Sequence, residues 1–170
     1  MAIAAARTKV CTPQSGGLTS IWLTDEANVT SFTLTSTAYS ANTLGAGAWY
    51  KFEFSQDLAE FRETGTREGN AYSNLQEIEF NFAGMNQVDR DHIEDIIESS
   101  HCGIVAVIKD SDGVKWTVGY SEAQGVERPL KLTSDTTLTG KGMTDGKGST
   151  LILSTTTNEK ARTYTGSDPT

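Results

Sequence analysis

The chain contains two histidines, and one of them lies among acidic residues that could ligate a metal ion. His92 is three residues from both Asp89 and Asp95, so on a helix each carboxylate would share a face with the imidazole. A zinc site needs further ligands, and the sequence has neither an HxxxH nor an HExxH pattern to supply them. We interpret these residues as a solvated acidic helix face and predict no metal ion and no cofactor.

Two pairs of carboxylates are spaced closely enough to suggest acid–base chemistry. Glu77 and Glu79 would share the outward face of one strand, where solvated charge is the ordinary arrangement, and Glu60 and Glu63 form a second pair. A glycosidase normally holds its acid in a cleft beside aromatic sugar platforms. A serine hydrolase is not indicated either, because no GxSxG pattern is present. We predict no catalytic residues and no enzyme, with an enzyme of unrecognised type as the alternative.

Three glycine-containing stretches resemble ligand-binding loops but fit turns better. Asp110–Gly113 resembles the start of an EF-hand loop, yet no glutamate stands at the twelfth position and Trp116 interrupts the pattern. Gly140–Gly142 and Thr144–Gly148 carry lysines but lack the phosphate-loop order and precede a strand. All three are predicted to be turns.

The overall charge is acidic, with a formal net charge of −8 and a sequence pI of about 4.7. Such a chain repels phosphate backbones, which argues against a DNA-binding protein but not against a surface that DNA slides past. No apolar stretch approaches the roughly 20 residues that span a bilayer. Met1–Thr8 lacks a basic region, so we predict no signal peptide, and we expect Cys11 and Cys102 to be free thiols.

Alternating side chains predict half-buried strands at Trp49–Phe54 and Glu77–Phe82. The residues expected to face the core there are Tyr50, Phe52, Phe54, Ile78, Phe80 and Phe82. Further strands are predicted at Ser20–Leu23, Val29–Thr35, Ile104–Ile108, Val114–Tyr120, from Leu130 onwards, and at Thr150–Ser154, which we take as the last strand. Ile104–Ile108 is continuously apolar, as a strand covered on both faces would be. Ala41–Ala48 is predicted to be a connection.

One amphipathic helix is predicted at Asn86–Ser100, with Ile93, Ile96, Ile97 and Ser100 on one face. Asn86 can cap its start, and Gly103 is a natural stop. With the strands, this gives a mainly β fold, namely an antiparallel β-sandwich or barrel with one helix packed against it. We predict a single domain over residues 1–170, with an N-terminal extension at 1–19 and a polar C-terminal tail at 158–170.

The stretch Ser55–Gln76 is long for a connection between two strands, and long connections are usually functional or disordered. It is either a surface excursion or an extended arm or hairpin that orders against a neighbouring subunit. In the second case aromatic residues would anchor the contact, since they are enriched in interface cores. The predicted interface residues are Phe61, Arg62, Arg67, Glu68 and Tyr72.

This order of elements resembles the tail tube proteins of tailed bacteriophages and the inner-tube proteins of contractile injection machines. The stretches Gly47–Phe54, Tyr72–Phe82, the helix and Gly103–Gly113 are also similar to virion proteins from phages and prophages of Bacteroidetes-type hosts. The resemblance covers about residues 20–157. It rests on the order of the elements and on the general character of their residues, with no diagnostic motif.

The resemblance implies rings of subunits, commonly hexamers, that stack into a hollow tube. DNA would pass through the lumen without specific binding, and the partners would be further copies of this chain and neighbouring tail proteins. The protein would be made in the host cytoplasm and located in the virion. Alternatives are a tube terminator, a head–tail connector, a capsid decoration protein, or a β-sandwich module that binds carbohydrate or a host surface through exposed aromatic residues.

Overall fold

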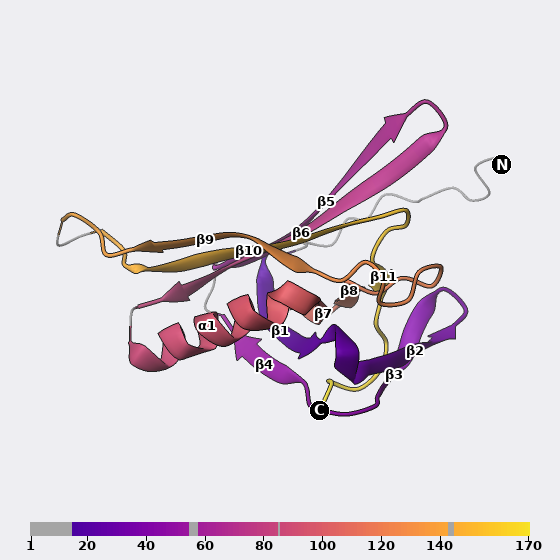
Figure 1. Ribbon diagram of the computed structural model, residues 1–170, viewed down its shortest axis with the longest axis horizontal. Coiled ribbons are helices and arrows are strands. Elements are labelled where there is room, and N and C mark those ends of the chain that lie inside the picture. Colours follow the sequence, from indigo (N-terminus) through magenta and orange to yellow (C-terminus); the bar gives the residue numbers. More distant parts are fainter. Residues whose placement is uncertain (1–14, 55–57, 85, 143–144) are drawn as a thin grey trace.

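The computed structural model describes residues 15–54, 58–84, 86–142 and 145–170 (Figure 1). The described chain is mainly β, with three antiparallel sheets and one α-helix. The two larger sheets face each other across a hydrophobic core. The predicted fold class, a β-sandwich with a single helix, is therefore confirmed.

The first sheet has five strands in the order β11-β8-β7-β1-β4. Their bounds are β1 Leu18–Asp25, β4 Tyr50–Glu53, β7 Ile104–Asp110, β8 Lys115–Val118 and β11 Arg162–Thr163. The central strand β7 is buried on both faces: Ile104, Ala106 and Ile108 belong to one core cluster, and Val105 and Val107 to a second. This confirms the interpretation of its continuous apolar run.

The second sheet has four strands in the order β5-β6-β10-β9. Their bounds are β5 Ala59–Glu68, β6 Ala71–Ala83, β9 Lys131–Leu138 and β10 Gly148–Thr157. The inner face of this sheet contributes Ile78, Phe80, Leu151 and Leu153 to the core between the sheets, all with no exposed surface. Period-two alternation along β6 thus predicted its inward face correctly.

A two-stranded sheet covers the outer face of the five-stranded sheet. It consists of β2 (Val29–Thr35) and β3 (Ala38–Leu44), and a short 3-10 helix, Glu26–Asn28, leads into it from β1. Its residues Phe32 and Tyr39 join Trp22 and Val107 in the second core cluster. The sequence prediction of a connection at 41–48 is wrong for residues 41–44, which belong to β3.

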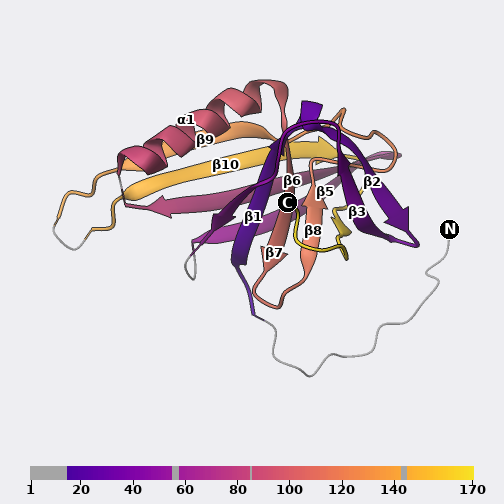
Figure 2. The same ribbon diagram turned by 90° about the horizontal axis from the view of Figure 1, so that it is seen from below.

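The helix α1, Gln87–Cys102, lies along β9 and close to β1, at one side of the sandwich (Figure 2). The Asn86 side chain accepts a hydrogen bond from the Asp89 N–H at 2.7 Å, which caps the first turn. Ile93, Ile96 and Ser100 are buried. The predicted cap, inward face and stop at Gly103 are all confirmed.

The structure corrects two further predictions. Tyr50 is on the same face of β4 as Phe52 but is 63% exposed instead of buried, because β4 is the short edge strand of its sheet. Strand β10 is not the last one, since β11 follows it. The residues after β10 pack back on the body, where Tyr164 is 4% exposed and Lys115 Nζ donates to the Gly166 carbonyl at 2.6 Å.

A pair of buried tyrosines in the second core cluster gives opposite expectations for stability. The Tyr39 hydroxyl is buried and makes no hydrogen bond within the described chain, whereas the Tyr164 hydroxyl accepts from Asn42 Nδ2 at 2.8 Å. Tyr39→Phe removes an unsatisfied polar group, so we expect the free energy of unfolding at pH 7 to rise by about 1 kcal/mol. Tyr164→Phe leaves the Asn42 amide without its acceptor, so it should lower the free energy of unfolding at pH 7 by about 1 kcal/mol.

The two variants should also differ in alkaline solution. Burial raises the pKa of Tyr39 above its usual value of 10.0. Above pH 10 the phenol ionises more readily in the unfolded chain than in the folded one, so the free energy of unfolding declines in any protein that keeps Tyr39. Tyr39→Phe lacks this loss, so its advantage over the unaltered protein should widen above pH 10. Urea titrations between pH 7 and 11 check both points. Equal loss of stability in the two phenylalanine variants at pH 7 would contradict this assignment.

Candidate assembly surface

The most prominent surface feature is the hairpin formed by β5 and β6, which extends beyond the body of the molecule (Figure 1). Strand β10 backs β6 only as far as the Asn74–Thr157 pair, so residues 64–73 are exposed on both faces. The turn is possible because Gly69 adopts a φ of 59°. Within the stretch Ser55–Gln76, which the sequence left open as a loop or an arm, residues 59–76 therefore form a regular hairpin, and residues 55–57 lie outside the described residues.

Three of the five predicted interface residues gather at the distal end of this hairpin. Tyr72 is 43% exposed, and its ring covers Gly65, where an added Cβ would lie 2.5 Å from the tyrosine oxygen. Arg67 Nε donates to the Gly69 carbonyl at 3.0 Å, and Glu68 is exposed. The distal end thus offers an aromatic ring and both signs of charge.

The other two predicted residues lie at the base of the hairpin, on opposite faces. Phe61 is half-buried and packs against the core between the sheets. Arg62 is on the outer face, where it pairs with Glu60 and lies 3.9 Å from Glu77. The hydrogen bond to Glu60 is the main cause that raises the pKa of Arg62. The five residues therefore do not form one patch.

A buried polar cluster, which the sequence analysis missed, fixes the base of the hairpin. The Glu63 carboxylate accepts hydrogen bonds from Asn74 Nδ2 at 2.9 Å, Gln76 Nε2 at 3.1 Å and the Ala161 N–H at 2.7 Å. The Glu159 carbonyl accepts from the same two amides at 3.4 Å. These bonds join both strands of the hairpin to the segment after β10, so the hairpin is held in a defined direction.

The outer face of the four-stranded sheet is polar. Glu60, Arg62, Glu77 and Glu79 surround Ile152, which brings three carboxylates and one guanidinium together. The large exposed apolar side chains in the described chain are Tyr50, Tyr72, Val88, Val114 and Leu138. Tyr72 and Leu138 lie at the ends of β6 and β9, so the middle of this face has no aromatic platform among the described residues.

Both edges of the four-stranded sheet are open within the described chain. Strand β5 forms one edge and β9 the other, and each has a β-strand on one side only. The four strands alternate in direction, so β5 and β9 run antiparallel to each other. An edge strand presents unpaired N–H and C=O groups that can pair with another chain.

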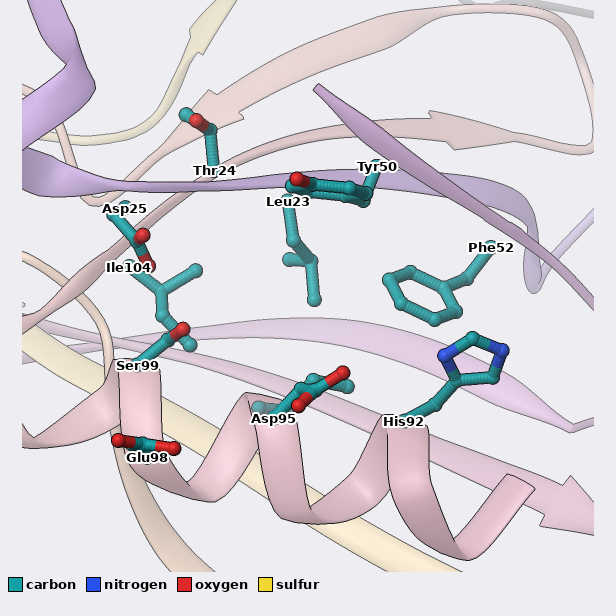
Figure 3. Close-up of a pocket in the computed structure, with 11 residues that line it drawn as sticks. Leu23, Thr24, Asp25, Tyr50, Phe52, His92, Asp95, Glu98, Ser99 and Ile104 are labelled. Atoms are coloured by element: carbon teal, nitrogen blue, oxygen red, sulfur yellow. The ribbon is translucent and has the colours of Figure 1, made fainter. Parts of the chain in front are cut away.

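A pocket of about 350 Å³ opens between α1 and the strands β1 and β4 (Figure 3). Leu23, Phe52 and Ile104 form its apolar floor, and His92 stands against Phe52 with a ring separation of 5.9 Å. Three carboxylates line it, from Asp25, Asp95 and Glu98, and the lining includes no lysine or arginine. We call this site the acidic pocket.

The residues considered for metal or acid–base chemistry fall in different places: His92 and Asp95 both line the acidic pocket, and Glu60, Glu77 and Glu79 share the outer face of the four-stranded sheet. No group of three or more possible metal-ligating side chains occurs among the described residues. Glu60 is exposed on the outer face, whereas Glu63 is in the buried cluster. Cys102 is exposed at the end of α1, and Cys11 lies outside the described residues. No described helix is long and apolar enough to cross a membrane.

No protein-family model, no curated protein and no solved structure matches this chain.

Proposed function

We propose that this protein is a structural subunit of a virion, whose copies assemble into rings that stack into a tube around passing DNA. The observation that carries the proposal is the four-stranded sheet with two open and mutually antiparallel edges. If β9 of one copy pairs with β5 of the next, the sheet continues as one antiparallel sheet. Repetition of such a head-to-tail contact closes a ring and covers both edges of this sheet in every copy.

The surface of that sheet fits a bore better than a binding face for sugars. Its outer face bears the carboxylates of Glu60, Glu77 and Glu79 with Arg62 among them. In a closed ring this face would line the lumen, where an excess of negative charge keeps DNA from adhering. A carbohydrate-binding sheet would instead present exposed aromatic rings, and the described part of this face has none in its middle.

The hairpin supplies a contact between rings in this proposal. Its distal end is exposed on both faces, and the Glu63 cluster fixes its direction. A projecting distal end that no other described segment covers gains apolar and polar contacts when a neighbouring ring covers Tyr72 and Arg67. The number of copies in a ring is taken from the resemblance, which implies six.

The test is negative-stain electron microscopy with light scattering over a concentration series. We expect the unaltered protein to form rings and stacked tubes. In a variant with Thr66–Ser73 replaced by Asn-Gly, Gly65 and Asn74 stay opposite each other across a two-residue turn. That variant should form single rings and no tubes. Val88→Ser, which removes an exposed apolar side chain from α1, should leave the tubes unchanged.

Two outcomes contradict the proposal. A strict monomer at the highest concentration would exclude a self-assembling tube, leaving a connector that needs another protein. Tubes that form as well without the distal hairpin as with it would remove the hairpin from the contact between rings. Urea unfolding of the shortened variant ensures that the loss of tubes does not reflect loss of the fold.

A further inference from the structure

The acidic pocket and the first residues of the chain are complementary in charge and polarity. Residues 1–14 contain Arg7 and Lys9 and no acidic residue, in a chain whose remainder has 12 basic and 22 acidic residues. They also include the apolar side chains of Ile3 and Val10. The pocket offers the opposite set, an apolar floor with carboxylates on the rim.

Among the described residues that line the pocket, none is a lysine or arginine that could neutralise these carboxylates, and His92 is the one basic side chain. Lys51 lies on β4 between Tyr50 and Phe52, which both line the pocket. Because side chains alternate along a strand, the Lys51 side chain points to the other face of the sheet. There it lies over the Trp22 ring at 5.5 Å and pairs with Glu53 at 2.5 Å. Three carboxylates around an apolar floor favour a segment in which a basic side chain and an apolar side chain lie close together.

Residues 1–14 join the body at the end of β1 that is far from the pocket, so the segment that binds in the pocket belongs to a second copy. The Ser15 N–H donates to the Asp112 carboxylate at 3.1 Å, at the turn after β7, and Leu18 pairs with Asp110. The pocket lies at the other end of β1, where Asp25 pairs with Ile104. Leu18 and Asp25, the first and last residues of β1, are seven steps apart, about 23 Å at the usual rise per residue.

This separation decides between binding within one copy and binding between copies. Arg7 is eight residues before Ser15, so it reaches the pocket of its own copy only if the whole intervening segment runs straight back along β1. A segment that leaves one end of a subunit and binds at the opposite end of the next one makes a head-to-tail contact. Contacts of this kind repeat from copy to copy and either close a ring or extend a filament.

We propose that the acidic pocket binds residues 1–14 of a neighbouring copy, with Arg7 or Lys9 paired to Asp25, Asp95 and Glu98 and an apolar side chain on the floor. The inference rests on the proposed function in that it needs copies arranged head to tail. The pocket itself can nevertheless be tested without any assembly.

The experiment is a fluorescence anisotropy titration of a labelled peptide with the sequence of residues 1–14. The protein is the full chain carrying Arg7→Glu and Lys9→Glu, so that its own first residues do not compete with the peptide. We expect saturable binding that weakens as salt is raised, because the contact is partly ionic. Adding Asp95→Lys to this protein should weaken binding at least tenfold.

Glu94→Lys is the matched control, because it makes the same change of charge on the same helix at a residue that does not line the pocket. It should alter the affinity less than twofold. Equal weakening by both variants would show general charge attraction and overturn the proposal, as would the absence of saturable binding. Rings seen by electron microscopy without peptide binding would overturn this inference and leave the proposed function intact, and binding without rings would do the reverse.

Discussion

Thr133→Pro is expected to prevent ring formation while leaving the subunit folded. Thr133 lies on the edge strand β9, at the point where the pairing with β10 shifts between Ile152 and Leu153. It is the residue without a partner on β10, so a proline there removes no paired residue from its own sheet. The proline removes an N–H from the strand, and its ring occupies space that an adjoining strand needs.

The expected effect is large because every copy in a ring carries the change. If each contact is weakened about tenfold, the loss is multiplied over all contacts of the ring, so monomers should dominate at concentrations where the unaltered protein forms rings. Sedimentation velocity over a concentration series measures this. The shortened hairpin should give rings without tubes, whereas Thr133→Pro should give neither, which separates the two contacts of the proposed assembly.

Thr133→Ala is the matched control. It removes the hydroxyl that is hydrogen-bonded to Ser154 Oγ at 2.5 Å but keeps the backbone N–H, so its rings should persist. Rings that form equally well with proline at this position would show that β9 is not part of the contact between neighbouring copies. Urea unfolding should show a loss of about 1–2 kcal/mol for the proline variant, consistent with an altered edge strand and an intact core.

The sequence predicted those parts of the fold in which the pattern of apolar side chains indicates a buried face. The helix has a capping residue, an apolar face at helical spacing and a glycine stop, so its bounds follow from local signals. Strand β7 is apolar throughout because each of its faces has its own core cluster. Strand β6 alternates cleanly from Asn74 to Phe82, where one face is buried.

The hairpin could not be located in the same way because its distal half has no buried face. Residues 64–73 are exposed on both sides, so no alternation of apolar and polar residues arises there. Strand β3 escaped prediction for a related reason, since Tyr39 is the only buried side chain in it. Pattern arguments detect strands through burial, and these segments are held by backbone pairing instead.

The candidate site was predictable only in part, because its parts are distant in sequence. The Glu63 carboxylate and the Ala161 N–H are 98 residues apart, and the acidic pocket combines two strands with the helix. The spacing of residues within one segment cannot predict contacts between segments that are this far apart in the sequence. The prediction that both Phe61 and Tyr72 belong to one interface was made without knowledge of the hairpin geometry. In the hairpin, the Phe61 ring packs against the core, whereas the Tyr72 ring is exposed near the tip.

Gly103→Ala is expected to lower the free energy of unfolding by about 3–5 kcal/mol, from backbone strain and overpacking together. Gly103 joins α1 to β7 at a φ of 147°, a conformation that side chains rarely permit. An added Cβ would lie 2.2 Å from Pro129 Cγ and 2.5 Å from its Cβ. Relief by movement is restricted because the next residue, Ile104, is bonded to Leu130 in both directions at 2.9 and 2.8 Å.

Gly113→Ala separates the two causes, because Gly113 has a φ of 86° but no atom within 4 Å of an added Cβ. It should cost only about 1–2 kcal/mol, measured by the same urea unfolding. Combining Gly103→Ala with Pro129→Gly should recover part of the loss, since the colliding ring is then absent and neighbouring changes are not additive. If the double variant is no more stable than the sum of the single changes predicts, the contact with Pro129 is not what requires glycine at this junction, and the backbone conformation alone is responsible.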